Sequence, residues 1–219
     1  MVTYEDVKQN EDIKTYIKKA DEALSALGFT EHSFAHVGIA CKRCSYILET
    51  LGRDTREIEL AKIAAYMHDI GNLVNRVDHS QSGAVMAFRI LDKMGMDASE
   101  AAAVVSAIGN HDEGTGVPID DISAALIIAD KSDVRRSRVR NTDVTNFDIH
   151  DRVNYSVKSS VLEISEDKKT ITLRLSIDTA YGSIMEYFEI FMNRMLLCRK
   201  AAEKLGLIFK LEINGQPLL

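Results

Sequence analysis

The stretch AAYMHDIGN, residues 64–72, decides the fold. An apolar run of helical character ends there in the adjacent pair His68 and Asp69, and a glycine follows. A buried imidazole beside a buried carboxylate is costly unless another group pairs with both. A divalent metal ion is the usual partner, so we predict that this pair binds metal. Gly71 is expected to adopt the left-handed conformation that ends such a helix.

Further histidines and aspartates flank this pair, each near an expected helix end or on an apolar helix face. Helices from distant parts of a chain can place such residues around one cavity. We therefore predict a site for two metal ions. The ligands of the first ion are expected to be His36, His68, Asp69 and Asp130. The ligands of the second are expected to be His79, His111 and a bridging Asp69.

Mixed imidazole and carboxylate ligands suit transition metals better than calcium. Iron or manganese is the first expectation, with zinc, nickel or magnesium as alternatives. A water bridging two metal ions becomes hydroxide near neutral pH and can attack a phosphorus atom in line. The ligand set therefore favours hydrolysis, with Asp69 at the centre of the chemistry.

Composition limits the function classes. The chain has 219 residues, 46% of them hydrophobic, and a net charge of −6. A protein of this charge does not coat long nucleic acids, and no apolar run is long enough to span a membrane. The three cysteines form no disulfide framework. Cys41-x-x-Cys44 falls inside an expected helix, and we interpret it as a pair of half-buried helix residues. We expect a cytoplasmic protein without a signal peptide.

Hydrophobic periodicity predicts a mainly α protein with a small C-terminal α+β appendage. Apolar residues recur at helical spacing in segments that end at glycine, histidine or aspartate. The expected helices span residues 3–27, 30–51, 55–69, 80–94, 99–109 and 123–134. Strict alternation in 171–177 indicates a half-buried strand. The appendage is expected to have the order β-β-α-β, over residues 155–164, 171–177, 183–205 and 209–213. We place the domain boundary between residues 1–145 and 146–219.

The order His, His-Asp, His, His, Asp resembles the HD superfamily of metal-dependent phosphohydrolases. The matching stretches are residues 36–40, 65–72 and 127–131, so the resemblance covers roughly 30–140. It implies an HD-type helical bundle and hydrolysis of a phosphate ester, often a nucleotide. The two extra histidines resemble the two-metal subset of the family. Residues 110–118 are distantly similar to the HD-GYP signature of cyclic-dinucleotide hydrolases, but Asn110 and Val117 depart from it, and Asn72 replaces a common lysine.

The same resemblance guides the expected substrate contacts. The spacing to His68 favours His36 over His32 as the first ligand, which leaves His32 as a substrate-facing or surface residue. Five basic residues lie in segment 131–140, directly after the last aspartate. Lys131 is expected to steady the phosphate charge. Arg135 and Arg136 are expected to bind substrate phosphate, because a guanidinium forms paired hydrogen bonds with it.

Two other functions fit the same residues. A similar ligand set holds two irons in the oxygenase branch of the HD fold, and an HD-fold sensor could bind a nucleotide without turnover. The basic segment favours a small phosphorylated substrate, with a nucleotide as the first expectation. The apolar stripe of the 183–205 helix is expected to pack on the sheet. It exceeds what a small sheet can cover, so it is also a candidate homodimer face.

Overall fold

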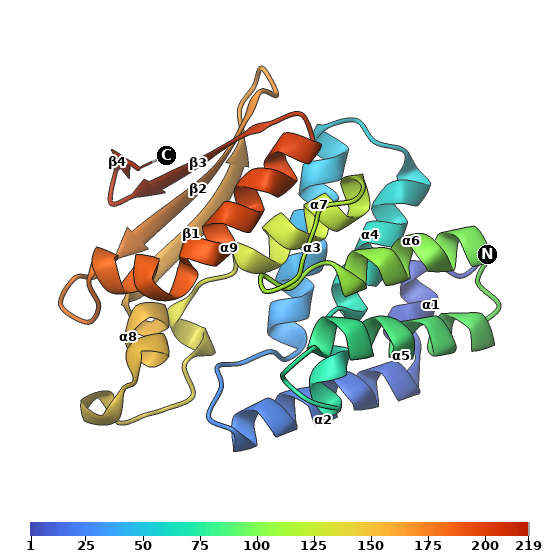
Figure 1. Ribbon diagram of the computed structural model, residues 1–219, viewed down its shortest axis with the longest axis horizontal. Coiled ribbons are helices and arrows are strands. Elements are labelled where there is room, and N and C mark those ends of the chain that lie inside the picture. The colour runs from blue at the N-terminus through green and yellow to red at the C-terminus, as the bar shows by residue number, and fades with distance from the viewer. Residues whose placement is uncertain (219) are drawn as a thin grey trace.

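The computed structural model describes residues 1–218 as a helical bundle with a small sheet packed against one side (Figure 1). The elements in chain order are α1 (Tyr4–Gln9), α2 (Glu11–Ala26), α3 (Phe34–Thr50), α4 (Thr55–Met67), η1 (Ile70–Leu73), α5 (His79–Lys93), α6 (Ala98–Gly109), α7 (Asp121–Lys131), η2 (Arg136–Arg138), η3 (Val144–Asn146), α8 (Ile149–Ser156), β1 (Val157–Ile164), β2 (Thr170–Ile177), α9 (Ile184–Lys204), β3 (Ile208–Ile213) and β4 (Gln216–Pro217). The predicted class, mainly α with an α+β appendage, is confirmed.

The helical part is built around α3, α4 and α7, which pack against one another. Buried alanines let these helices approach closely, and α7 is buried along nearly its whole length. Each helix of this central set carries a polar residue of the predicted metal site near one end. The core therefore fixes the spacing of those residues, since a close-packed interior does not yield easily.

The predicted 3–27 helix is two helices in the structure. Thr3 and Asp6 form a capping box at the start of α1. Asn10 then adopts an extended conformation, and its side chain accepts hydrogen bonds from the backbone of Asp12 and Ile13. Asparagine caps helices in this way. The spacing of apolar residues stays helical on both sides of Asn10, so the hydrophobic pattern does not reveal the break.

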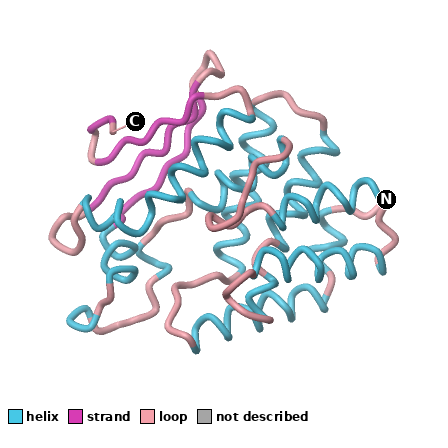
Figure 2. Tube along the Cα trace, in the orientation of Figure 1, coloured by secondary structure: helices cyan, strands magenta, loops and turns pink. Residues whose placement is uncertain are grey.

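The appendage is a four-stranded sheet in the order β1-β2-β3-β4, with α9 as the crossover between the parallel strands β2 and β3. In Figure 2 the strands gather at one side of the molecule, beside the helices. The alternation predicted for β2 is confirmed, because Ile171, Leu173 and Leu175 are buried. The start of the first strand was placed too early. Residues 149–156 form α8, which Asp148 caps by accepting from the backbone of Asp151.

Helix α9 joins the appendage to the bundle, because it packs against α7 on one side and β3 on the other. Its buried residues include Phe191, Met195 and Cys198, as the stripe predicts. Met185 and Met192 on the same helix are exposed. A homodimer contact at this face stays a prediction.

Candidate metal centre

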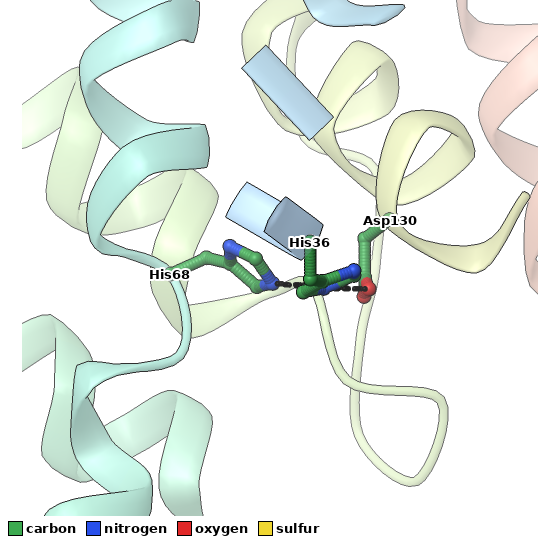
Figure 3. Close-up of side chains that lie close together, drawn as sticks. All are labelled: His36, His68 and Asp130. Carbon is green, nitrogen blue, oxygen red and sulfur yellow. Dashed lines mark hydrogen bonds and ion pairs between the residues drawn. The ribbon is translucent and has the colours of Figure 1, made fainter. Parts of the chain in front are cut away.

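Three predicted ligands meet at the centre of the bundle. His36 lies in the first turn of α3, His68 follows the last residue of α4, and Asp130 lies near the end of α7. The Nε2 atom of His36 is 3.3 Å from Nε2 of His68 and 3.3 Å from Oδ1 of Asp130. Figure 3 shows these three side chains directed toward one another. Their facing atoms lie within 4.8 Å of one another, so they could hold one metal ion.

Asp69 extends this group toward two further histidines. Its Oδ2 atom lies 3.2 Å from Nε2 of His68 and 3.6 Å from Nε2 of His36. Its Oδ1 atom lies 3.6 Å from Nε2 of His79 and 3.9 Å from Nε2 of His111. The two oxygens of one carboxylate thus face two different histidine pairs, which is the arrangement that a bridging ligand needs. We call these five residues and Asp130 the His/Asp cluster.

The hydrogen-bond partners of the four rings determine which nitrogen faces the cluster. On every ring Nδ1 lies near an oxygen acceptor outside the cluster: Asp133 Oδ2 at 2.7 Å for His36, and backbone carbonyls at 2.6 to 3.1 Å for the others. Nδ1 is therefore the donor in the neutral rings, and the four Nε2 lone pairs point inward. This is the tautomer that metal-binding histidines adopt.

Apart from Arg76, whose Nη1 lies 3.2 Å from Nε2 of His79, the described residues offer these inward-facing nitrogens no donor from outside the cluster. The Nε2 atoms of His79 and His111 are 3.2 Å apart, so two lone pairs face each other. Oδ2 of Asp69 is buried and accepts no hydrogen bond. A cation between these atoms satisfies them all, whereas neutral packing does not. The donor set therefore fits divalent transition metals.

The charges of the cluster also attract a cation. Burial alone would lower the pKa of His68, but the Asp69 and Asp130 carboxylates raise it to about 10. Burial would raise the pKa values of both carboxyl groups, yet the neighbouring cations hold them well below the usual range. In the absence of metal a proton on His68 occupies part of this negative site, and metal binding has to displace it.

Gly71 brings the second histidine pair close, and not by the means predicted. Its φ angle is not positive, so it is not a left-handed helix end. A Cβ atom there would lie 2.5 Å from the backbone nitrogen of Gly83 and 2.7 Å from Oγ of Ser82, and even closer to the carbonyl oxygen of His79. The absent side chain lets η1 pack directly on the start of α5, which carries His79 to the cluster.

Lys131 supports the cluster from behind the last aspartate. It is buried, and its Nζ lies 2.8 Å from Oδ2 of Asp130 and 2.7 Å from Oε2 of Glu113. Glu113 in turn accepts a hydrogen bond of 2.9 Å from Nε of Arg194 on α9. Burial lowers the pKa of Lys131, but the two carboxylates raise it on balance. A direct contact between Lys131 and substrate stays a prediction.

The other predicted substrate residues lie in two places. Arg135 donates to Oδ1 of Asp133, whose other oxygen holds His36, so it lies behind the ligand. Arg136 turns away, since its guanidinium lies over the ring of Tyr155 and donates to that residue's carbonyl. Both arginines line a separate surface depression. His32 stays beside the cluster, with its ring 5.6 Å from the ring of His36.

A cavity of about 300 Å³ opens next to His32, and we call it the arginine cavity. Its lining residues come from the helical part and from the appendage. They are Leu27, Gly28, Phe29, Thr30, His32, Arg76, Arg138, Asp148, His150, Asn154, Phe191 and Arg194. Nη1 of Arg76 lies 3.2 Å from the ring nitrogens of His79, so the cavity adjoins the His/Asp cluster.

Sequence reasoning missed the cavity arginines. Arg138 was part of the recognised basic segment but was not singled out there. Arg76 and Arg194 belong to no basic segment, and His150 lies outside the histidine pattern. Asp133 was also assigned no role, although it had a signal: a carboxylate three residues after a ligand at a helix end falls near the same site.

Comparison with known proteins agrees with this geometry. Residues 37–137 match the HD domain family. The chain contains an HD domain. The HD domain match starts one residue after His36 and includes the other five members of the His/Asp cluster. Arg194 and His150, which line the cavity, lie outside it. Within residues 1–218, no helix has the length and apolar character needed to cross a bilayer.

Two individual proteins resemble the chain. The uncharacterized protein MJ1020 of Methanocaldococcus jannaschii is 24% identical over 204 residues, which are 82% of this chain and 77% of that protein. The crystal structure of a predicted HD superfamily hydrolase from an uncultured Thermotogales bacterium is 28% identical. The structural match covers 57% of this chain and 67% of the other, with a TM-score of 0.45.

Proposed function

We propose that this chain is a metal-dependent phosphohydrolase that cleaves a phosphate ester at the His/Asp cluster. The observation that carries the proposal is the arginine cavity beside the cluster. Arg76, Arg138 and Arg194 line it, and Asp148 is the only acidic lining residue in the described part of the chain. A cavity with this charge selects an anion, and arginine is the preferred side chain for phosphate oxygens.

The HD domain and the donor set of the cluster support the hydrolytic part of the proposal. His36, His68, Asp69 and Asp130 would hold one divalent ion, and Asp69, His79 and His111 a second. Metal ions in such a site acidify a water molecule and stabilise negative charge on a phosphoryl group. The name of the Thermotogales protein, a predicted HD superfamily hydrolase, agrees with this activity class.

The chain's own residues would hold the phosphoryl group and the ligands in place. Arg76 lies against His79 and can donate to the phosphate oxygens nearest the cluster. Asn72 donates to Oδ1 of Asp69 at 3.0 Å, which fixes the orientation of that carboxylate. Lys131 engages the outer oxygen of Asp130, so the inner oxygen, Oδ1, remains directed at the histidines. Preorganised contacts of this kind lower barriers because nothing has to rearrange during the reaction.

The test is hydrolysis by protein loaded with iron, manganese or zinc, followed as inorganic phosphate released from monoesters and as p-nitrophenol released from the diester. The panel contains p-nitrophenyl phosphate, bis-p-nitrophenyl phosphate, nucleoside monophosphates and sugar phosphates. Asp69→Asn should lose activity by about 1,000-fold or more, because it removes the charge shared by both histidine pairs. Asp92→Asn is the matched control, since Asp92 is an exposed aspartate on α5.

Two results would contradict the proposal. One is full phosphate release by the Asp69→Asn protein. The other is the absence of both phosphate and p-nitrophenol release by the wild-type protein with every metal on the panel, although metal binding is measured directly. Oxygen consumption without phosphate release would instead favour the oxygenase chemistry that a similar ligand set can carry.

A further inference from the structure

We propose that the substrate is a compact phosphate ester with a second anionic group, a carboxylate or another phosphate, which Arg194 and Arg138 bind. The inference rests on the proposed function, because it assigns the scissile phosphate to the His/Asp cluster. What it adds is the chemical class of the rest of the substrate and the residues that select it.

The arginine cavity carries more positive charge than one phosphoryl group at the cluster requires. Arg76 contacts His79 and is the arginine at the cluster. Arg138 and Arg194 enter the cavity from other elements, the η2 segment and α9. Asp148 cannot neutralise both, because its carboxylate also caps α8. Glu113 pairs with Nε of Arg194, and Asp133 lies 3.8 Å from Nη1 of Arg138. These carboxylates engage only one side of each guanidinium, so an anionic ligand can bind the remaining donors.

Both of these arginines have donors to spare. Arg194 uses only Nε, on Glu113, and no described residue accepts a hydrogen bond from its two terminal nitrogens. Arg138 uses Nε and Nη1 on the carbonyl oxygens of Glu31 and Asp133, which leaves Nη2. Burial lowers the pKa of Arg138, the Asp133 carboxylate opposes that shift, and repulsion from Arg194 adds to it. An anion that accepts from both removes this repulsion and fills the unused donors.

Aromatic rings hold two of the guanidinium groups in place. The Cζ atom of Arg194 lies 4.4 Å from the centre of the Phe191 ring, and that of Arg76 lies 5.8 Å from the centre of the Phe29 ring. Both distances lie within the range of cation–π attraction, which favours these positions of the two guanidinium groups. Arg76 at the cluster and Arg194 on α9 are thus positioned independently of each other. Each can bind a different anionic group of one substrate molecule.

The size of the cavity limits the substrate to a small molecule. A volume of about 300 Å³ is at the lower end of the range of ligand pockets, which runs from about 300 to 1,000 Å³. A dinucleotide does not fit that space. The cavity therefore favours a sugar bisphosphate or a phosphorylated hydroxy acid over an ester with one phosphate and an uncharged remainder.

The experiment compares substrate pairs that differ in the second anion, with metal-loaded full-length protein. The pairs are 3-phosphoglycerate against glycerol 3-phosphate, and fructose 1,6-bisphosphate against fructose 6-phosphate. Adenosine monophosphate represents a single phosphate with an aromatic remainder. In the wild-type protein kcat/KM should be about 10-fold or more higher for the doubly anionic member of each pair, the size expected for a charged hydrogen bond.

Three variants assign that preference to Arg194. Arg194→Met should reduce the ratio of kcat/KM values within each pair to nearly 1. Arg194→Lys should keep part of the preference. Arg199→Met, at an exposed arginine of the same helix, should leave it unchanged. A structural role for Arg194 would lower both rates alike and leave the ratio as it was.

The outcomes separate this inference from the proposed function. Equal kcat/KM values within each pair, a preference for adenosine monophosphate, or an unchanged ratio in Arg194→Met would overturn it. If no substrate releases phosphate, the proposed function has failed, and binding to chelator-treated protein decides the second site. Calorimetry should then show pyrophosphate bound about 10-fold more tightly than phosphate, with the difference lost in Arg194→Met. Equal affinities for pyrophosphate and phosphate would refute the proposed second anion site.

Discussion

Replacing Gly71 by alanine should damage both the fold and the metal site, although only one methyl group is added. A Cβ atom there would lie 2.5 Å from the backbone nitrogen of Gly83 and closer still to the carbonyl oxygen of His79. These are backbone atoms at the start of α5, so no side chain can turn aside. The two segments have to separate by roughly 1 Å to restore ordinary contact.

The cost follows from that displacement. Overpacking a well-packed core typically costs about 1 to 3 kcal/mol, and a clash with backbone on both sides belongs at the upper end of that range. For a chain of this size about 3 kcal/mol corresponds to a melting temperature lower by about 6 to 12 °C. The displacement also moves His79 away from Asp69, and a misplacement of about 1 Å at a reacting centre can cost about 100-fold in rate.

The assay is thermal unfolding followed by circular dichroism, with chelator-treated protein so that metal binding does not contribute. Gly38→Ala is the matched control, because Gly38 lies in α3 two residues after His36 and a Cβ there meets nothing within 4 Å. That variant should be more stable by about 0.5 to 1 kcal/mol, the usual gain for alanine over glycine in a helix. A loss of stability in Gly71→Ala together with a gain in Gly38→Ala would support the packing argument.

One result would refute this reasoning. If Gly71→Ala melts within 2 °C of the wild-type protein, a limit of about 1 kcal/mol, and also binds metal with the same affinity, then the contact between η1 and α5 does not depend on a glycine. Titration of the metal content of both variants distinguishes a local loss of the His79 side of the site from a general loss of stability.

Three further predictions follow from the surroundings of the cluster. Asp133→Asn should weaken metal binding by about 10- to 100-fold, because it removes the charge that orients His36; isothermal titration with zinc measures this, and an unchanged affinity would contradict it. Lys131→Met should lower the free energy of unfolding by about 3 to 5 kcal/mol, because it removes the cation that pairs with the Asp130 and Glu113 carboxylates. An unchanged urea unfolding curve would show that water solvates these carboxylates. Burial raises the pKa of the Cys198 thiol to about 12, so at pH 8 only about one thiol in ten thousand is ionised. Ellman's reagent should therefore detect no thiols in the native protein and all three after denaturation, whereas rapid labelling of the native protein would contradict the burial.

The ligand positions were predictable because each one is tied to a local signal. An apolar run with helical spacing ends at His68, and another ends at Asp130, so the side chains at those ends had to face the interior. Periodicity predicts which face of a helix is buried, and burial makes an unpaired histidine or aspartate conspicuous. The spacing from Asp130 also places Asp133 near the site, but its role as the partner of His36 depends on a 2.7 Å contact with a residue far away in the chain.

Features that depend on approach between segments were not predictable from local pattern. Gly71 was expected to end a helix by its own backbone conformation, yet the structure requires glycine there because another segment passes so close. The break at Asn10 keeps the apolar period on both sides, so periodicity alone joins α1 to α2. Arg136 sits in the basic segment that follows the last ligand, but η2 turns its guanidinium onto Tyr155.

The arginine cavity shows most clearly why a division of the chain in sequence need not divide the function. The HD domain match ends at residue 137, and the predicted ligands all precede that point. Yet Arg194 reaches the site from α9, and it is joined to Asp130 through Glu113 and Lys131 by contacts of 2.7 to 2.9 Å. If the cavity selects the substrate as proposed, that selection depends on the appendage, because α9 both lines the cavity and contacts a residue next to a predicted ligand. Relatives that share the HD ligands but carry another C-terminal segment should therefore differ in substrate while keeping the same metal chemistry.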